Sequence, residues 1–163
     1  GGAGGGILNL TLETSIEIEG SILVDGAHGI GNNAGAGSGG TAIINTPEIT
    51  GSGLISCNGG QGSGKGGGGA GGRMKIIAKK IYSYQGTLTA YGGGNDENVK
   101  TVKAGPGTIY VQKGADVLSS PEHHLIVTGA TTDPLQIQTR TQITGASAIE
   151  FVYDTFTLSG KMQ

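Results

Sequence analysis

Residues 20–26 read GSILVDG, and this pattern of alternating apolar residues between two glycines returns twice along the chain. The copies read GLISCNG at 53–59 and GTLTAYG at 86–92, so each starts 33 residues after the one before it (20, 53, 86). A degraded fourth copy, HHLIVTG, starts at 123 instead of 119 and lacks the first glycine. Four further glycines keep the same step, namely Gly6, Gly39, Gly72 and Gly105. A fixed period of this length indicates an internal structural repeat.

Apolar residues alternate with a period of two inside each copy, as Ile22 and Val24 do, and this period is typical of strands. The other common repeat of this length is the helical ankyrin unit. The glycine content argues against it, since each glycine inside a helix costs roughly 1 kcal/mol relative to alanine. We therefore predict an all-β fold: a right-handed parallel β-helix (β-solenoid) with one coil per 33-residue repeat and glycine-rich loops stacked on one face.

Equivalent side chains of successive coils should form ladders, because such coils lie about 4.8 Å apart. One ladder predicted to point into the core comprises Ile22, Ile55, Leu88 and Leu125. The ladder beside it comprises Val24, Cys57, Ala90 and Val127. Other predicted columns are Asp25, Asn58 and Tyr91 pointing outward, and the equivalent apolar positions Leu10, Ile43, Ile76 and Ile109. The position of Cys57 favours a small buried hydrophobe over a nucleophile.

The composition limits the classes of function. Glycine supplies 35 of 163 residues, charged residues make up 13%, and the formal net charge is -2. A nucleic-acid partner is not expected without a basic excess, and no apolar run approaches the roughly 18 residues of a membrane span. Cys57 is the single cysteine, so an internal disulfide is excluded.

The repeat sets the predicted domain organisation. Residues 1–112 are predicted to form the glycine-rich β-helix coils, and residues 113–163 a divergent terminal coil or cap continuous with the same domain. The chain opens on GGAGGG, which we interpret as the middle of a loop in a larger or processed protein.

The segment 59–69, GGQGSGKGGGG, contains most of a phosphate-binding loop. Such a loop needs Ser or Thr after its lysine and a helix behind it. Gly66 follows Lys65 here, and more glycines come after it. We interpret the segment as a loop that packs on the equivalent loops of neighbouring coils, since glycine allows close backbone approach.

The order GGGGAGGRMKIIA, YQGTLTAYGGG and AGPGTIYV resembles the glycine-rich β-helix repeats of large secreted or cell-surface proteins, including adhesin-like ones. The resemblance covers about residues 4–112. It implies a scaffold that is extracellular or at the cell surface, and it does not extend to the last fifty residues or so.

Candidate chemical sites are few. Asn95, Asp96 and Glu97 gather oxygen ligands that suit calcium, although a solvated polar loop is the preferred interpretation. A polysaccharide-degrading site needs clustered carboxylates, whereas Asp25 is followed in its column by an amide and a phenol. No catalytic residue, cofactor or enzyme activity is therefore predicted. Asn9-Leu10-Thr11 is an N-glycosylation sequon, so Asn9 is a candidate glycan site.

Together these features favour an extracellular structural or adhesive module, part of a larger protein, fibre or surface assembly. Its expected partners are other copies or other extracellular structural chains. The alternative is a glycan-recognising module or polysaccharide-degrading enzyme, with carbohydrate as the partner. Tyr82, Tyr84, Tyr91 and Tyr110 could then supply stacking platforms, although Tyr82 lies in step with Ile16 and Ile49 and is predicted to belong to the core.

Overall fold

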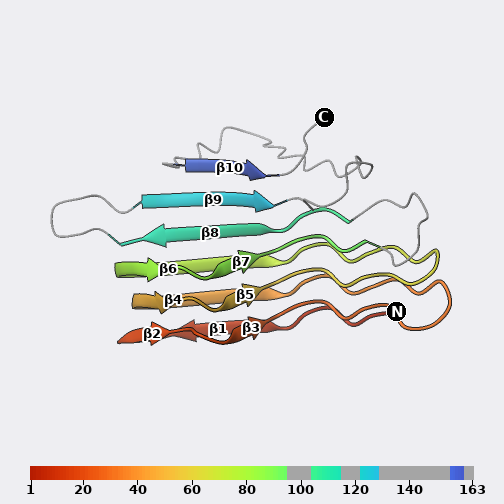
Figure 1. Cartoon of the computed structure of the whole chain (residues 1–163), viewed down its shortest axis with the longest axis horizontal. Helices are drawn as coiled ribbons and strands as arrows, with labels where there is room; N and C mark the ends of the chain where they lie inside the picture. The colour runs from red at the N-terminus through yellow and green to blue at the C-terminus, as the bar shows by residue number, and fades with distance from the viewer. Residues whose placement is uncertain (95–103, 115–121, 129–154, 160–163) are drawn as a thin grey trace.

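The computed structural model describes residues 1–94, 104–114, 122–128 and 155–159 (Figure 1). Within these ranges the chain forms strands and no helix, as the predicted strand content requires. The strands are β1 (Ile7–Thr11), β2 (Ser15–Glu17), β3 (Ser21–Leu23), β4 (Thr41–Gly51), β5 (Leu54–Ser56), β6 (Arg73–Tyr84), β7 (Thr87–Thr89), β8 (Thr108–Lys113), β9 (Glu122–Thr128) and β10 (Thr155–Ser159). Across the described ranges we find no helix with the length and apolarity to span a membrane.

The strands form two sheets. A seven-stranded sheet runs in the order β1-β4-β6-β8-β9-β10, with β2 also paired to β4, and a three-stranded sheet runs in the order β3-β5-β7. The chain therefore stacks in levels (Figure 1). We call them tier 1 (residues 7–40, with β1 to β3), tier 2 (41–72, with β4 and β5) and tier 3 (73–94, with β6 and β7).

Strands of successive tiers are parallel. Ile16 pairs with Ile49, and Ile49 pairs with Tyr82, which confirms the predicted register at that column.

The register is not constant along the seven-stranded sheet. Leu10 pairs with Ile44, Ile44 with Ile76, and Ile76 with Val111. The predicted column through Ile43 and Ile109 is therefore wrong, because it assumed a step of 33 residues at every position. A slip of one residue moves a side chain to the other face of its sheet, so Ile43 lies on the outer face while Ile44 is buried.

The prediction of a right-handed parallel β-helix is wrong. β8 and β9 pair in antiparallel fashion, with Lys113 opposite Glu122 and Thr108 opposite Val127, so the seven-stranded sheet is mixed. Only residues 114–121 connect the two strands, whereas a parallel neighbour needs a crossover of about a dozen residues or more. The chain reverses direction there, and it does not form the solenoid that the repeat indicated.

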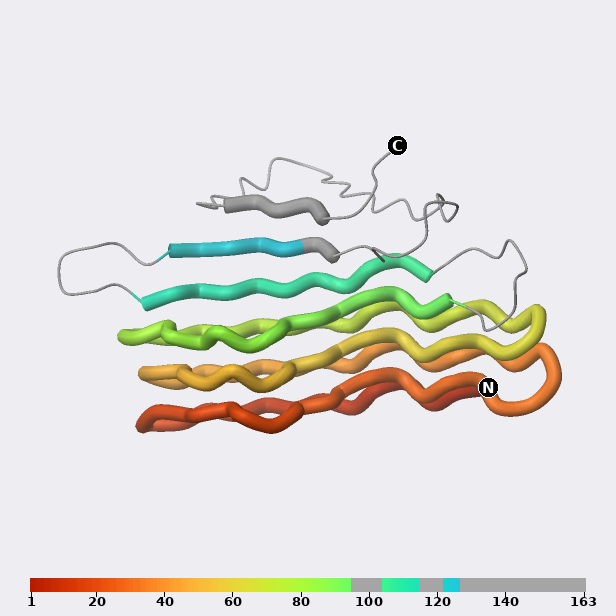
Figure 2. The backbone as a smooth tube through the Cα atoms, viewed as in Figure 1, coloured from red at the N-terminus to blue at the C-terminus, as the bar shows by residue number. Residues whose placement is uncertain are grey.

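The glycine-rich segments that follow β3 and β5 stack on each other through backbone hydrogen bonds (Figure 2). Gly26 donates its N–H to Asn58 O in the next tier, at 2.8 Å. Backbone hydrogen bonds also join the outgoing and the returning run of one glycine-rich segment. For example, Gly37 donates its N–H to Ala27 O at 2.9 Å. The backbone groups of these segments are thus largely paired with each other, which satisfies them without side chains.

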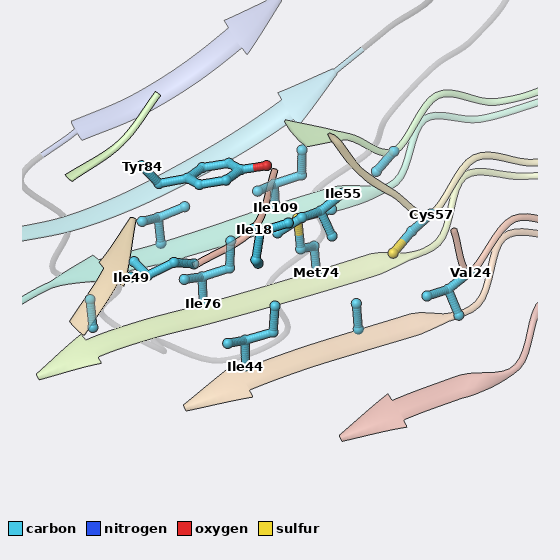
Figure 3. Packing of buried hydrophobic residues seen from close by; sticks show 14 residues of the cluster. Ile18, Val24, Ile44, Ile49, Ile55, Cys57, Met74, Ile76, Tyr84 and Ile109 are labelled. Atoms are coloured by element: carbon cyan, nitrogen blue, oxygen red, sulfur yellow. The ribbon is translucent and has the colours of Figure 1, made fainter. Parts of the chain in front are cut away.

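The hydrophobic core joins side chains from both sheets (Figure 3). The buried members are Ile18, Val24, Ala42, Ile44, Ile49, Ile55, Cys57, Met74, Ile76, Ala78, Tyr84, Ala90, Ile109 and Val111. Thr46 is a polar residue in this core, and its Oγ1 donates to Thr14 O at 2.7 Å or Glu48 O at 3.0 Å. Buried hydroxyls need such partners, and these two bonds hold the bend at which β4 changes direction.

Candidate functional site

The three-stranded sheet carries the first predicted ladder for three tiers. Ile22 of β3 pairs with Ile55 of β5, and Ile55 pairs with Leu88 of β7. Ile55 is fully buried, while Ile22 and Leu88 pack against the core from its margin.

The second ladder continues this register by one residue. Val24 donates its N–H to Ser56 O at 2.8 Å, and Cys57 donates to Thr89 O at 2.9 Å. In a parallel ladder these bonds place Val24 beside Cys57 and Cys57 beside Ala90. All three belong to the buried cluster, and Figure 3 shows Val24 and Cys57 together within it.

Leu125 and Val127 do not continue these ladders, so their predicted places are wrong. Both lie in β9 of the seven-stranded sheet, where Leu125 pairs with Tyr110 and Val127 with Thr108. Their motif has the alternation of a strand, but the strand runs in the opposite direction and in the other sheet.

Cys57 has the environment of a structural thiol. Its side chain is 0% exposed. Burial raises the pKa of the thiol from 9.0 to about 11, and the negative charge of Asp25 adds to this, while a hydrogen bond with the backbone of Ala42 opposes it. The reactive form of cysteine is the thiolate. A thiol that stays protonated at neutral pH and lies out of reach of solvent does not serve as a nucleophile.

A column of polar side chains follows the second ladder along the stack. The Asp25 carboxylate accepts hydrogen bonds from the Ser56 hydroxyl and, at 2.6 Å, from the Asn58 N–H. Asn58 repeats the arrangement one tier on, since its Oδ1 accepts the Tyr91 N–H at 2.7 Å, while its Nδ2 donates to Ser56 Oγ at 2.8 Å. Each of these side chains therefore satisfies a backbone donor of the next tier.

A second column does the same nearer the tip of the glycine-rich segments. His28 Nδ1 accepts the Gln61 N–H at 2.8 Å, and Gln61 Oε1 accepts the Gly94 N–H at 2.9 Å. The sequence predicted Asp25 and Asn58 only as outward-pointing side chains. It missed the hydrogen bonds that both columns make between tiers. The signal for them was the step of 33 residues between two pairs of hydrogen-bonding side chains, Asp25 with Asn58 and His28 with Gln61. These groups join tiers together and do not converge on an open space.

The tyrosines considered as stacking platforms do not form one surface. Tyr84 is 4% exposed, and its hydroxyl donates to Gly53 O at 2.7 Å. Tyr82 packs against the core and carries Lys113 Nζ over its ring at 5.4 Å. Burial raises the pKa of both phenols, which is the expected effect of desolvation. Tyr110 lies elsewhere, beside His123 of β9, with its hydroxyl 2.7 Å from His123 Nδ1.

The predicted metal and glycan sites have different outcomes. Asn95, Asp96 and Glu97, the calcium candidates, lie outside the described residues. In the part of the chain that is described, no group of three or more His, Cys, Asp and Glu side chains could hold a metal ion. Asn9 is exposed in the middle of β1, between the half-buried Leu8 and Leu10, so its amide projects from the outer face of the sheet.

Tier 1 presents an open backbone edge. Among the described strands, β1, β2 and β3 each pair on one side only, with β4, β4 and β5. Leu12 donates its N–H to Asn45 O, and Val24 donates to Ser56 O. Because alternate residues of a parallel strand bond to opposite sides, the backbone groups of Ile7, Asn9, Thr11, Ser21 and Leu23 face away from tier 2.

No protein-family model matches the sequence, and comparisons with curated proteins and with solved structures likewise found no match. The resemblance to adhesin-like repeats therefore stays a prediction.

Proposed function

We propose that the chain is a structural or adhesive module, at the cell surface or outside the cell, that assembles with further chains through the open edge of tier 1. The observation that carries this proposal is the unprotected state of β1 and β3, which form that edge together with β2, where Glu17 is charged. Proteins usually blunt an edge strand with charge, proline or a bulge, because a row of free N–H and C=O groups recruits another strand. β1 reads ILNLT and β3 reads SIL, so neither strand contains a charged residue or a proline.

Exposed apolar side chains lie along the same edge. Ile7 is 81% exposed and Leu23 is 62% exposed. A strand added to β1 or β3 would pair with the backbone and cover part of these side chains at the same time. The two hydrogen-bonded columns of polar side chains support a passive role, because they join tiers, as at Asp25 and Asn58.

The edge can be tested with two paired double variants. In 0.5 M salt, where charge contacts are screened, we expect the 163-residue chain to self-associate with rising concentration, and Ile7→Pro with Leu23→Pro to abolish this association. Both N–H groups point outward, so proline removes two edge donors without breaking a bond to tier 2. The control, Ile7→Ala with Leu23→Ala, keeps the donors and should still associate. Sedimentation velocity measures the outcome. A parent chain that stays monomeric, or a proline variant that assembles like its parent, would contradict the proposal.

The extracellular placement is implied by the resemblance to adhesin-like repeats, and the sequon of β1 adds to it. We expect the chain, secreted from eukaryotic cells, to carry an N-linked glycan at Asn9, since the amide is exposed in a terminal strand. Mass measured before and after glycosidase treatment checks this, with Asn9→Gln as the unmodified control. A secreted chain whose mass does not change on treatment would argue against this placement.

A further inference from the structure

Charge is divided between the tiers. Tier 1 contains acidic residues and no lysine or arginine: Glu13, Glu17, Glu19 and Asp25. Tier 3 contains basic residues and no acid: Arg73, Lys75, Lys79 and Lys80. Tier 2 lies between them with one of each sign, Glu48 and Lys65. Because the tiers stack, a division along the sequence becomes a division in space.

Charges of both signs lie on one surface, at the bend within β4 and β6 (Figure 2). The register changes there, since Thr46 pairs with Ala78 but Glu48 pairs with Ile81. In the pairing of β6 with β4, Lys79 and Lys80 thus both lie opposite Pro47, while the backbone of Gly114 packs against them from the other side. In tier 1 the Thr46 hydroxyl reaches Thr14 O, and this places Glu13 at the same bend. We call the surface formed by Glu13, Pro47, Lys79 and Lys80 the corner face.

The charges of the corner face are free to bind. Glu13, Lys79 and Lys80 are exposed, and none of them is in an ion pair with another described residue. Glu13 and the lysines are two tiers apart, about 10 Å at the usual strand spacing. At this separation water and salt weaken their attraction, so the two signs do not neutralise each other within the described part of the molecule.

The geometry points to a second copy of the chain as the partner. We propose that two copies pair through their corner faces about a two-fold axis that passes near Pro47, perpendicular to the face. The rotation places Glu13 of each copy on Lys79 and Lys80 of the other, so one surface is complementary to itself. This lateral contact rests on the proposed assembling role but uses side-chain charge, whereas the open edge uses the backbone.

A charge-reversal experiment tests the contact in the Ile7→Pro with Leu23→Pro background, where edge association is removed. One variant carries Glu13→Lys, and the other carries Lys79→Glu with Lys80→Glu. We expect the background chain to dimerise at low salt, with Kd rising about tenfold or more in 0.5 M salt. Each reversed variant alone should be monomeric because it brings like charges together. An equimolar mixture should restore dimers, because both contacts of the pair are again of opposite sign.

The matched control is Lys65→Glu with Arg73→Glu, which changes the net charge by the same amount as Lys79→Glu with Lys80→Glu at two exposed positions away from the corner face. It should dimerise like the background chain. Sedimentation equilibrium with one fluorescently labelled variant reads out the mixture. Dimers of either reversed variant alone, or a mixture that stays monomeric, would overturn the corner-face proposal. If the corner-face proposal fails, the chain without the two proline substitutions can still assemble in 0.5 M salt, and this result would support the proposed function. If that chain does not assemble in 0.5 M salt, the result counts against the proposed function and not against the corner face.

Discussion

Replacing Gly69 with alanine is expected to lower the free energy of unfolding by about 3 kcal/mol or more, a cost typical of severe overpacking. A Cβ at Gly69 would lie 1.8 Å from Gly37 O and 2.4 Å from Gly37 C. Both atoms belong to the backbone of the stacked segment in tier 1, so no side-chain rotation can relieve the clash. Moving Gly69 away would also weaken two hydrogen bonds, its N–H to Gly60 O and the Gly93 N–H to its own carbonyl.

Gly67 provides the matched control two residues earlier in the same segment. It is exposed, and a Cβ there meets no atom within 4 Å. Gly67→Ala should be neutral or stabilise the chain by about 0.4–1 kcal/mol, because alanine restricts the unfolded chain. Urea denaturation followed by circular dichroism compares the two variants with the parent. Equal stability of both variants would show that the stacked segments do not pack as closely as the structure has them.

This contrast separates two uses of glycine that look alike in the sequence. The regular step of the motif predicted that the glycine-rich segments stack. It could not tell Gly69, which touches another backbone, from Gly67, which faces solvent. A glycine is required where its Cα hydrogen faces another backbone, and this depends on how each run is rotated about its own axis. A run of glycines has no alternation of apolar and polar side chains from which the rotation could be predicted.

The sequence predicted the local register well where the repeat is undisturbed. Glycines flank the strands of the three-stranded sheet at a constant step, so the Ile22 and Ile55 pairing followed directly. In the seven-stranded sheet the step varies, and β6 holds one more residue than β4 at the bend. The residues of β6 alone do not reveal the extra residue, because the buried Ala78 and Tyr84 keep the same even spacing on both sides of it.

The direction of β9 could not be predicted from its own residues. Side chains alternate between the two faces in parallel and antiparallel strands alike, so HHLIVTG fits either direction. The deciding feature was the connection before it, which is shorter than the glycine-rich segments that link the earlier strands. The division of charge between tiers 1 and 3 was also visible in the sequence, but it acquires a meaning only when the stacking brings Glu13 and Lys79 onto one surface.

Removing side-chain atoms at Ile44 is expected to cause a large loss of stability, and Ile44→Ala should cost about 4 kcal/mol. Ile44 is 0% exposed and lies between Leu10 of β1 and Ile76 of β6. Its loss therefore leaves a cavity in the middle of a column, where neighbours on both sides are held by backbone pairing and cannot move inward. Small domains have total stabilities of about 5–15 kcal/mol, so the variant should approach the limit of folding.

Two further variants keep this prediction decidable if Ile44→Ala does not fold. Ile44→Val removes a single methylene and should cost about 1 kcal/mol, which a folded chain can report. Ile30→Ala removes the same atoms as Ile44→Ala from a side chain that is 88% exposed, and should change stability by less than about 0.5 kcal/mol. Thermal and urea denaturation give the three values. If Ile30→Ala cost as much as Ile44→Val, the column through Leu10, Ile44 and Ile76 would not be the core of the fold, because burial alone distinguishes the two isoleucines.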